Sequence, residues 1–525
     1  MLSILIGHLP HLAAAAAALL CARKLLHYFQ LESYQFYGLY KTFTRQWKVA
    51  VLPTAVLGIF AYLLYLAAKV ICSDSGLFVK FIVFFVCSLI ILALGYVCSK
   101  YMQKGKEKKP FVMTARMKRL YIILGIVVLI FCWITPAHIL LLPLLVALAA
   151  LIALPVEKSI NRMYMKDAQR RMNEQPDLIR IGITGSYGKT SIKNILYTIL
   201  SQKYNVLSTP ASFNTPMGLT RVIRERLEPA HQVFLAEMGA RHRNDIKELT
   251  DFIHPTIGVL TSVGPQHLDT FKSLENIIET KYDLIRSLPT NGFAVFNDDH
   301  DICASLYEKT THVGKAIVGR SDGDIWAEDI SVSPTGSNFI LCFKNGKRLP
   351  CETRLLGAHN ISNILLSCAV AKHLGLSDLQ IQRGISLLQP VEHRLQLLKS
   401  AGGITVIDDA FNSNPAGAKA ALNVLREFSG RRIIVTPGMV ELGEKETEYN
   451  RAFGSQMASC ADICVLIGKK HTQPIRDGLL SEGFSAGNIY SYSSLSEATA
   501  WLRGFMQAGD VVLYENDLPD HYSET

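Results

Sequence analysis

Hydrophobic residues are patterned differently in the first third of the chain and in the remainder. The first third contains long apolar stretches, at residues 4–22, 49–72, 77–98 and 120–156. A helix that spans a membrane needs about 20 consecutive apolar residues. The last stretch is long enough for two such helices, joined by a turn at residues 135–138. The pattern therefore predicts a transmembrane region at residues 1–156 with about five helices.

The first apolar stretch allows a second interpretation. It contains an alanine run together with His8 and His11, and an apolar N-terminal segment can also be a cleaved signal peptide. Signal peptides carry positive charge ahead of the apolar part, whereas the first basic residue of this chain is Arg23. We therefore expect a retained helix.

From residue 178 onward, short apolar runs alternate with segments of helical periodicity. Such runs lie at residues 178–183, 232–236, 257–261, 293–297, 404–408, 433–437, 464–467 and 511–514. This alternation predicts parallel sheets with helices on both faces. Residues 310–356 break it with polar turns between alternating apolar positions, which predicts an antiparallel insertion. We expect a basic linker at 157–177 and two α/β domains, at 178–390 and 391–525. The junction between these two domains, near residues 390–394, is called the seam below.

The net charge of +10 comes from 54 Lys and Arg against 44 Asp and Glu. Positive charge can indicate nucleic-acid binding, but here it gathers beside apolar stretches, in the loops 23–48 and 99–119. The partner that this distribution favours is an anionic membrane surface and not nucleic acid. Basic loops stay in the cytoplasm. We therefore expect a multi-pass cell-membrane protein with its N-terminus outside and the region after residue 157 in the cytoplasm.

The 11 cysteines are spread thinly, and none forms a Cys-x-x-Cys pair. Cys460 and Cys464 are the closest two, at a spacing that suits one face of a helix better than a zinc site. We expect reduced cysteines and no zinc.

Residues 182–194, with the sequence GITGSYGKTSIKN, lie between a predicted strand and a helical pattern that starts at Thr190. Backbone N–H groups at such a helix start cradle phosphates, Lys189 supplies a point charge, and Thr190 is placed to bind Mg²⁺. An ordinary glycine turn would explain the glycines but not the Gly-Lys-Thr-Ser ending. The usual pattern has glycine where this chain has Ile183. The run therefore predicts a variant P-loop that binds ATP with Mg²⁺.

Two polar residues follow apolar runs further along the chain. Glu237 comes directly after the run 232–236, and His267 follows the run 259–263 after Gly264, Pro265 and Gln266. Open α/β sheets bind ligands at the carboxyl ends of their strands, so this carboxylate and imidazole could complete a Mg²⁺–ATP site. Each alone is more often a satisfied polar group. The predicted fold class is membrane helices followed by α/β, with a P-loop parallel-sheet central domain and a Rossmann-like C-terminal domain.

A set of motifs in order carries a family resemblance. They are TGSYGKTS at 184–191, SFNTPMG at 212–218, EMGA at 237–240, HLD at 267–269, Lys281, GAHN at 357–360 with Asn363, and DDAFNSNP at 408–415. With these motifs the chain resembles the Mur ligases, the ATP-dependent amide ligases that build the peptidoglycan stem peptide. The last motif and PGMVELG at 437–443 are most similar to the members that add D-alanyl-D-alanine. The resemblance covers about two-thirds of the chain, residues 178–515.

The resemblance implies a role for each matching residue. The ATP-binding residues would be Gly185, Ser186, Tyr187, Gly188, Lys189, Thr190, Ser191, Asn360, Arg394 and Asp409. The metal would be held by Thr190, Glu237, His267 and Lys281. Lys281 falls where family members carry a carbamylated lysine, and an unmodified exposed lysine is the alternative. Lys189, His267 and Lys281 would be catalytic; Asn214 and Thr215 would face the muramyl peptide, and Asn412 and Asn414 the incoming amine.

The implied reaction has two steps. A carboxylate of the muramyl-peptide acceptor attacks the γ-phosphate of ATP, and an amine, D-alanyl-D-alanine in the most similar members, then attacks the acyl phosphate. The first step brings anions together, so it needs Lys189, Mg²⁺ and the helix N-terminus to neutralise charge.

Two departures from the family pattern bear on the substrates. Usual members begin with a small domain that binds the uridine diphosphate of a soluble precursor, and this chain has apolar helices there instead. The acceptor is then either the nucleotide-linked precursor, with the helices as an anchor, or a lipid-linked muropeptide. Residues 514–520, YENDLPD, are acidic where members that add D-alanyl-D-alanine have a Lys-Gly-Ser-Arg-like run. Another amino acid or polyglutamate synthesis stays open, as does a P-loop ATPase of a transporter or sensor.

Overall fold

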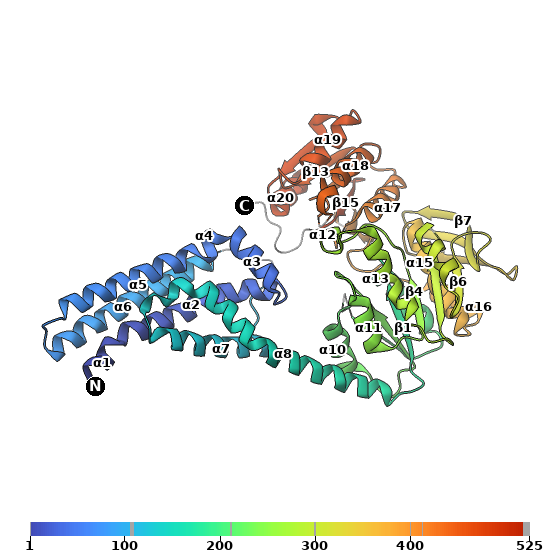
Figure 1. Cartoon of the computed structure of the whole chain (residues 1–525). Coiled ribbons are helices and arrows are strands. Elements are labelled where there is room, and N and C mark those ends of the chain that lie inside the picture. Colours follow the sequence, from blue (N-terminus) through green and yellow to red (C-terminus); the bar gives the residue numbers. More distant parts are fainter. Residues whose placement is uncertain are drawn as a thin grey trace. The chain divides into compact units, whose positions relative to one another are not determined.

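The computed structural model describes residues 2–104, 110–210, 213–298, 301–399, 401–411, 413–440 and 442–517. The chain forms two compact units, residues 1–163 and residues 164–525 (Figure 1). The first unit is helical, and the second contains two β-sheets covered by helices.

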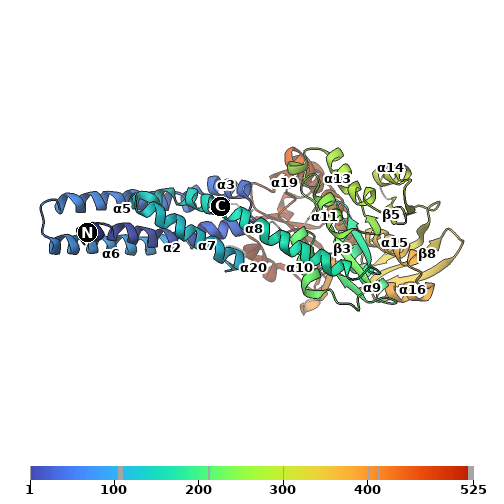
Figure 2. The same cartoon turned by 60° about the horizontal axis from the view of Figure 1, so that its bottom comes forward.

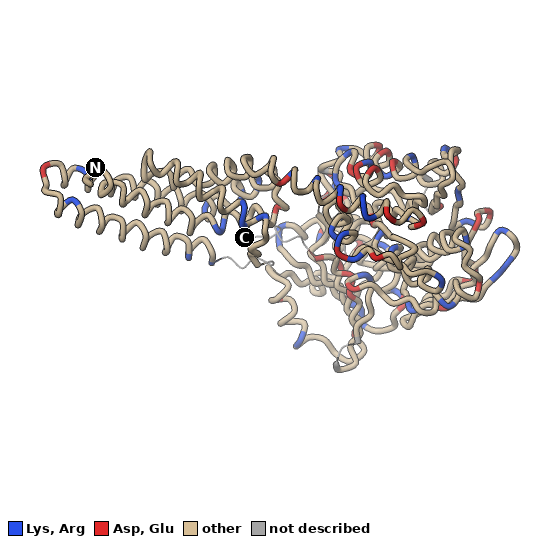
Figure 3. Tube along the Cα trace, turned by 90° about the horizontal axis from the view of Figure 1, so that it is seen from below, with Lys and Arg blue, Asp and Glu red and all other residues tan. Residues whose placement is uncertain are grey.

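The first unit is a bundle of long apolar helices. Its elements are α1 (Leu2–Gly7), α2 (Leu9–Leu31), α3 (Phe36–Arg45), α4 (Trp47–Ala50), α5 (Leu52–Ile71), α6 (Leu77–Met102), α7 (Ala115–Cys132), a 3-10 turn (Pro136–Leu141) and α8 (Leu142–Asn173). Helices α5 and α6 lie side by side and are joined by a short turn (Figure 2). Their only charged residues are Lys69 near the end of α5 and Lys80 and Lys100 near the two ends of α6, so the middle of each helix is uncharged (Figure 3).

Four helical stretches in the described residues are long and apolar enough to cross a membrane: Leu2–Leu31, Trp47–Ile71, Leu77–Met102 and Pro136–Asn173. The sequence predicts about five. The difference is α7, whose 18 residues include Arg116, Lys118 and Arg119 in its first turns. The remaining predicted helix, α7, is therefore present, but its charged start leaves an apolar part shorter than the other four stretches have.

Helix α7 nevertheless runs antiparallel to α2 over most of the length of that helix. At one end, the Arg116 guanidinium in the first turn of α7 lies 3.9 Å from the centroid of the Tyr34 ring, just after α2. Midway along α2, the Leu19 carbonyl oxygen accepts a hydrogen bond from the Tyr121 hydroxyl at 3.3 Å. At the other end, the rings of His8 and Trp133 lie 4.7 Å apart between centroids. The start and the end of α7 thus lie beside opposite ends of α2.

Small residues bring the helices of this bundle together, while large apolar residues face outward. A Cβ atom added to Gly95 of α6 would come within 2.4 Å of the Ala17 Cβ on α2, so the two helices touch through glycine and alanine. Phe78 of α6, by contrast, is 75% exposed. Small residues at helix contacts and large apolar residues outside are typical of helices packed in lipid.

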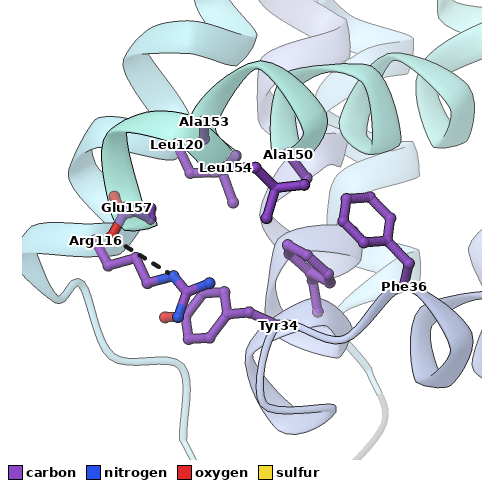
Figure 4. Close-up of a pocket in the computed structure, with 9 residues that line it drawn as sticks. Tyr34, Phe36, Arg116, Leu120, Ala150, Ala153, Leu154 and Glu157 are labelled. Carbon is purple, nitrogen blue, oxygen red and sulfur yellow. Dashed lines mark ion pairs between the residues drawn. The ribbon is translucent and has the colours of Figure 1, made fainter. Parts of the chain in front are cut away.

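A narrow cleft lies at the end of the bundle where α7 begins (Figure 4). Arg119 donates two hydrogen bonds to the buried Glu157 carboxylate, at 2.7 and 2.8 Å. The Arg116 guanidinium lies 3.9 Å from the Glu157 carboxylate and 3.9 Å from the centroid of the Tyr34 ring. Apolar side chains, including Phe36 of α3, form the rest of the wall. Two guanidinium groups against one carboxylate leave this end of the bundle basic.

Helix α8 continues past the predicted boundary at residue 156 and into the predicted basic linker. Ala168 and Met172, near its end, pack into an apolar cluster of the second unit. Asp167 accepts a hydrogen bond from Arg224 of α10 (Pro216–Arg226) at 2.8 Å. Most of the stretch 157–177 is therefore helical and partly packed. The domain boundaries inferred from the sequence remain predictions.

The larger sheet of the second unit has nine strands in the order β2-β3-β1-β4-β5-β6-β7-β8-β9. Their bounds are β1 Ile179–Thr184, β2 Val206–Ser208, β3 Val233–Glu237, β4 Ile257–Leu260, β5 Phe293–Asn297, β6 Gly314–Val318, β7 Ile325–Ser333, β8 Gly336–Phe343 and β9 Arg348–Thr353. Strands β1 to β6 pair in parallel, and β7, β8 and β9 pair antiparallel to one another. The antiparallel insertion predicted at residues 310–356 is confirmed for β7, β8 and β9, whereas β6, which lies in the same range, is parallel to β5.

Helices cover both faces of this sheet. They are α9 (Lys189–Leu200), α10, α11 (Asp245–Ile253), α12 (Leu268–Phe271), α13 (Leu274–Arg286), α14 (Asp301–Lys309), α15 (Ala358–His373) and α16 (Asp378–Ser386). Ile181 of β1 packs in one apolar cluster with α9 and α15, and Phe234 of β3 packs in another with α11 and α13. Successive residues of a strand point to opposite faces, so each strand of the sheet can contribute to both clusters.

The smaller sheet has six strands in the order β10-β11-β15-β12-β13-β14. Their bounds are β10 Gln396–Lys399, β11 Thr405–Asp409, β12 Arg432–Thr436, β13 Ile463–Ile467, β14 Ile489–Tyr492 and β15 Val511–Glu515. All pair in parallel except β10, which is antiparallel to β11. Helices α17 (Pro415–Arg426), α18 (Glu446–Ala458), α19 (Gln473–Ser481) and α20 (Leu495–Phe505) cover it. The predicted fold class, membrane-type helices followed by two parallel-sheet α/β domains, is confirmed.

Candidate active site

The loop between β1 and α9 has a backbone that two glycines make possible. Gly185 has φ of 154°, and a Cβ atom there would lie 1.9 Å from the Thr261 hydroxyl. Gly188 has φ of 81° and directly precedes α9. Side chains are strongly disfavoured at both positions. The glycines are thus required by the loop itself, in addition to any role in binding.

Hydrogen bonds fasten this loop to the segment after β4. The Ser186 N–H donates to the Ser262 carbonyl oxygen at 2.7 Å, and the Ser186 hydroxyl donates to the Gly264 carbonyl oxygen at 2.8 Å. The Thr261 hydroxyl donates to the Tyr187 carbonyl oxygen. The loop is therefore held in shape, with the N-terminus of α9 behind it. A helix N-terminus favours bound anions through its free N–H groups and its dipole.

Lys189 folds back over the loop. Its ammonium group donates to the Gly185 carbonyl oxygen at 2.8 Å and approaches the Ser186 carbonyl oxygen at 3.3 Å. Burial lowers the pKa of Lys189 to about 8; the Glu237 carboxylate opposes this shift and Arg394 adds to it. A phosphate chain in the loop would favour the charged ammonium, because an anion nearby stabilises a cation.

Thr190 and Glu237 form a group of oxygen atoms at the carboxyl end of the sheet. The Thr190 hydroxyl lies 3.1 and 3.2 Å from the two Glu237 carboxylate oxygens. The side-chain amide of Asn214 donates to the same carboxylate at 3.3 Å. Hydroxyl and carboxylate oxygens are the ligands that Mg²⁺ prefers. The donor set here fits the metal that the sequence predicts.

Lys193, one turn after Thr190 on α9, completes this group. Its ammonium lies 3.0 Å from a Glu237 carboxylate oxygen, and both side chains are almost fully buried. The sequence reasoning missed this lysine. Its spacing of four residues from Lys189 on one helix was the available signal, since both then lie on the same face.

Lys281 of α13 is 1% exposed, so the alternative of an exposed helix lysine is wrong. Burial lowers its pKa well below the usual value, and the charge of Lys189 lowers it further.

His267 directly precedes α12 and is half-buried, with φ of 51°. Within the described part of the chain, no three His, Cys, Asp or Glu side chains gather as a metal site. A carbamate on Lys281 would add the carboxylate that such a group lacks.

A pocket of about 310 Å³ lies beside the loop, between α9 and the start of the seam. Ser191 and Asn194 of α9 form one side, and Asn360 and residues 388–391 form the other, with Arg394 at the seam. The Asn360 side chain donates to the Leu356 carbonyl oxygen at 2.9 Å, which fixes its orientation. The pocket brings together three of the predicted ATP-binding residues, Ser191, Asn360 and Arg394.

Arg394, which lines this pocket, lies close to Asp409 at the end of β11 in the smaller sheet. The Leu395 N–H donates to the Asp409 carboxylate at 3.1 Å, and the Arg394 guanidinium stacks 4.4 Å from the centroid of the Phe411 ring. Burial lowers the pKa of Arg394, and the carboxylates of Asp409, Glu237 and Glu515 oppose that shift. The guanidinium thus lies among acidic groups from both sheets.

The predicted substrate residues also cap helices. The Thr215 hydroxyl accepts a hydrogen bond from the Gly218 N–H at 3.2 Å at the start of α10. The Asn414 side chain does the same for the Gly417 N–H at 2.9 Å at the start of α17. Asn412 lies outside the described residues. A capping role explains Thr215 and Asn414 without a substrate, whereas Asn214 contacts the Glu237 carboxylate directly.

Two family models match the second unit. The Mur ligase middle domain matches residues 183–371, and the Mur ligase glutamate ligase domain matches residues 393–514. Residues 1–182 lie outside both matches.

Two similar curated proteins are described as UDP-N-acetylmuramoyl-tripeptide–D-alanyl-D-alanine ligase. The protein of Mycobacterium tuberculosis is 30% identical over 354 residues, which are 63% of this chain and 69% of that protein. The protein of Bacillus subtilis is 27% identical over 338 residues, 64% of this chain and 72% of that protein.

Solved structures agree with these matches. The crystal structure of MurF from Acinetobacter baumannii aligns with a TM-score of 0.63 at 25% identity, over 69% of this chain and 78% of that one. MurF ligase from Thermotoga maritima, in complex with ADP, aligns with a TM-score of 0.61 at 24% identity, over 69% of this chain and 81% of that one. The second alignment supports the fold alone.

Proposed function

Because the chain belongs to the Mur ligase family of ATP-dependent amide ligases, we propose that it adds D-alanyl-D-alanine to a muramyl tripeptide during synthesis of the peptidoglycan stem peptide. The observation that carries the proposal is the meeting of three parts: the phosphate loop, the Thr190–Glu237 pair and Arg394 with Asp409 from the second sheet. The relatives' printed description supports the choice of substrates.

In the first step, a carboxylate oxygen of the acceptor bonds to the γ-phosphorus of ATP, and ADP leaves. Both reactants are anions, so the step requires positive groups around the phosphates. Lys189, the N-terminus of α9 and Arg394 supply them. Mg²⁺, held by Thr190 and Glu237 when bound, would neutralise further phosphate charge.

In the second step, the amine attacks the acyl carbon, inorganic phosphate leaves and the amine loses a proton. Water competes with the amine at this stage, because an acyl phosphate hydrolyses readily. The smaller sheet domain, closed over the larger one, would exclude that water. Equal single-turnover hydrolysis of ATP with and without the amine would contradict this role for closure.

Lys281 and His267 would hold a second metal ion, with Lys281 as its carbamate. The supporting observation is the lowered pKa of the buried Lys281 amine, because only a neutral amine adds to CO₂. His267 follows β4, which pairs with β1, the strand that leads into the phosphate loop.

Transfer of heavy-isotope oxygen from a labelled acceptor carboxylate to inorganic phosphate tests the mechanism. An acyl phosphate moves one carboxylate oxygen onto the phosphate, so labelled phosphate is expected. Label-free phosphate together with amide formation would rule the acyl phosphate out. ATP hydrolysis that depends on neither carboxylate nor amine would instead favour a P-loop ATPase of another class.

One segment of the chain bears on the identity of the added amine. Acidic residues stand at 514–520 where a basic run is usual among members that add D-alanyl-D-alanine. Another amino acid, or glutamate in a growing chain, is therefore the alternative. Competition between D-alanyl-D-alanine, single amino acids and glutamate in one reaction, followed by product masses, separates these cases.

We further propose that the acceptor is a lipid-linked muropeptide at the inner face of the cell membrane. The observations in favour are the apolar helices at residues 1–163 and the basic end of their bundle, where Arg116 and Arg119 lie. Holding enzyme and acceptor on one surface raises their effective concentration. Turnover of the nucleotide-linked acceptor alone would leave the helices as an anchor only.

For membrane topology we propose five crossings, with the N-terminus outside and residues 164–525 in the cytoplasm. The antiparallel course of α7 along α2 supports counting α7 as a crossing in spite of its basic start. Long basic side chains at a helix end can reach the lipid headgroups. Four crossings would put both ends of the bundle on one side, so labelling of a cysteine introduced before α2 decides between the two.

A further inference from the structure

Two carboxyl groups, of the buried Glu515 and the half-buried Asp409, stand side by side at the carboxyl end of the smaller sheet. Strands β11 and β15 are parallel neighbours, and Asp409 is paired in register with Glu515. Register partners on adjacent strands project to the same face. Glu515 is 1% exposed. It belongs to the segment that departs most clearly from the family pattern.

Other contacts hold Glu515 in this position. The Ser413 hydroxyl donates to one carboxyl oxygen of Glu515, Oε1. Asn516 accepts from the Ser413 N–H at 3.0 Å and donates to the Gly438 carbonyl oxygen at 2.5 Å. The other oxygen of Glu515, Oε2, is buried and accepts no hydrogen bond from any residue that the structure describes. An ionised carboxylate would leave that oxygen unsatisfied.

A proton resolves this arrangement. Two adjacent carboxylates repel each other when both are charged, so one of them keeps its proton. If Oε2 of Glu515 carries it, that oxygen becomes a donor to Asp409 and no buried group is left unsatisfied. Burial raises the pKa of Glu515 well above the usual value, and Asp409 raises it further, while Ser413 and Arg394 act in the opposite sense.

Asp409 is the member of the pair that keeps its charge. Burial raises its pKa as well, but Arg394, Glu515 and the Leu395 N–H all stabilise the ionised form. The next carboxyl group on β11, Asp408, is engaged with His393 Nδ1 at 2.7 Å. The neighbours of the pair are therefore the Arg394 guanidinium, the Ser413 hydroxyl and the Asp408 carboxylate, which is already bonded to His393.

We propose that Glu515 is a positioning residue for ATP, which shares one proton with Asp409 and so holds the Asp409 carboxylate toward the ribose hydroxyls. The inference rests on the proposed function, which assigns Asp409 to the ribose. It adds that this chain uses a neutral acid at the strand end where the most similar members carry a basic run. The site therefore contains a group whose ionisation opposes nucleotide binding.

The consequence is a nucleotide affinity that depends on pH. Below the folded-state pKa of Glu515 the pair holds its proton and Asp409 is fixed. Above it both carboxyls are charged, so they repel each other and the phosphates of ATP. Affinity is therefore retained at low pH and lost as the pH rises through the pKa of Glu515. Burial also lowers the pKa of Lys189, to about 8, and this second titrating group makes a matched variant necessary.

The test is direct binding of a fluorescent, non-hydrolysable ATP analogue to the full-length protein in lipid nanodiscs, from about pH 6 to pH 9. For the wild type, Kd is expected to rise by about tenfold for each pH unit above the pKa of Glu515. Glu515→Gln keeps a hydrogen-bond donor but cannot ionise, so only the shallower dependence due to Lys189 should remain. Glu482→Gln, an exposed carboxyl in the same domain, should behave as the wild type.

A pH profile in Glu515→Gln that matches the wild type would overturn the proposal. Ser413→Ala serves if the first variant does not fold. It removes the hydrogen bond that favours the ionised carboxylate, so the loss of affinity should move to higher pH, and an unmoved profile would also overturn the proposal. A wild type that binds no nucleotide at any pH would overturn the proposed function and this inference together.

Discussion

The two sheets of the second unit each place a buried glutamate at the carboxyl end of a strand. The charged groups beside the two glutamates have opposite signs. Glu237 of the larger sheet has a buried ammonium at 3.0 Å, a hydroxyl and an amide as partners. Glu515 of the smaller sheet has another carboxyl group. The first environment thus pairs a carboxylate with a cation, whereas the second favours a protonated carboxyl group.

This difference separates what is general in the family from what is particular to this chain. The larger sheet carries the phosphate loop and the oxygen ligands, which any ATP-dependent ligation requires. The smaller sheet contributes the seam and the end of β15, where the family pattern is lost. We therefore expect the type of reaction to depend mainly on the first sheet, and the pH dependence of nucleotide affinity to depend mainly on the second.

The largest effect is expected from removing charge at the phosphate loop. Lys189→Ala should lower kcat by about 1,000-fold, because a positive group that stabilises the transition state is worth several kcal/mol. ADP release in the presence of acceptor and amine measures it. Lys247→Ala, which removes an exposed partner of Asp251 on α11, is the control. Equal losses in the two variants would mean that the loop is not the catalytic centre.

The next largest effect should come from Lys281. Replacement by Met removes the amine that would take up CO₂, and we expect kcat to fall by about 100-fold, the scale of a lost metal ligand or its support. Wild-type protein depleted of CO₂ should lose activity and regain it on addition of bicarbonate, while the variant should not respond. A wild type indifferent to bicarbonate would exclude the carbamate.

A smaller effect, on stability rather than on turnover alone, is expected from Lys193→Met. This change leaves the Glu237 carboxylate buried with its ammonium partner removed, which costs about 3 kcal/mol in comparable ion pairs. Thermal unfolding should show the loss, and excess Mg²⁺ should restore part of it by binding the folded state. Lys247→Met, in an exposed pair, should change stability by about 1 kcal/mol or less. An unchanged midpoint of thermal unfolding for Lys193→Met would mean that the Lys193 ammonium does not stabilise the buried Glu237 carboxylate.

The smallest effects concern the residues that cap helices in the two domains. Thr215→Ala and Asn414→Ala should each lower the free energy of unfolding by about 1 kcal/mol through loss of an N-cap. Thr215 and Asn414 are also the predicted contacts of the acceptor and the amine. If they bind substrate, KM for one substrate should rise in each variant beyond the change in stability; if KM is unchanged, capping is their whole role.

Much of this architecture could be predicted from the sequence because each element has a local signal. Runs of apolar residues predicted β1, β3, β4 and β5 of the larger sheet and β11, β12, β13 and β15 of the smaller one, and the Gly-Lys-Thr-Ser ending predicted the phosphate loop. The short strands β2, β10 and β14 were missed, because three or four residues carry too little periodicity. The burial of Lys281 could not be read from periodicity, because it depends on how α13 packs against the sheet. The Glu515–Asp409 pair could not be predicted either: its members lie more than a hundred positions apart, and only the strand order makes them neighbours.

The helix count shows the same limit from the other side. The sequence around residues 115–134 is apolar enough to predict a helix, and α7 is there. Whether such a helix crosses a membrane depends on its partners and on where its three basic side chains lie, which local hydrophobicity does not contain.

The mass of the product formed from ATP, a muramyl tripeptide acceptor and D-alanyl-D-alanine shows directly whether the protein catalyses the proposed ligation. We expect an acceptor heavier by D-alanyl-D-alanine less one water, with ADP and phosphate formed in equal amounts. ATP consumption in the presence of both substrates, with the acceptor mass unchanged, would contradict it.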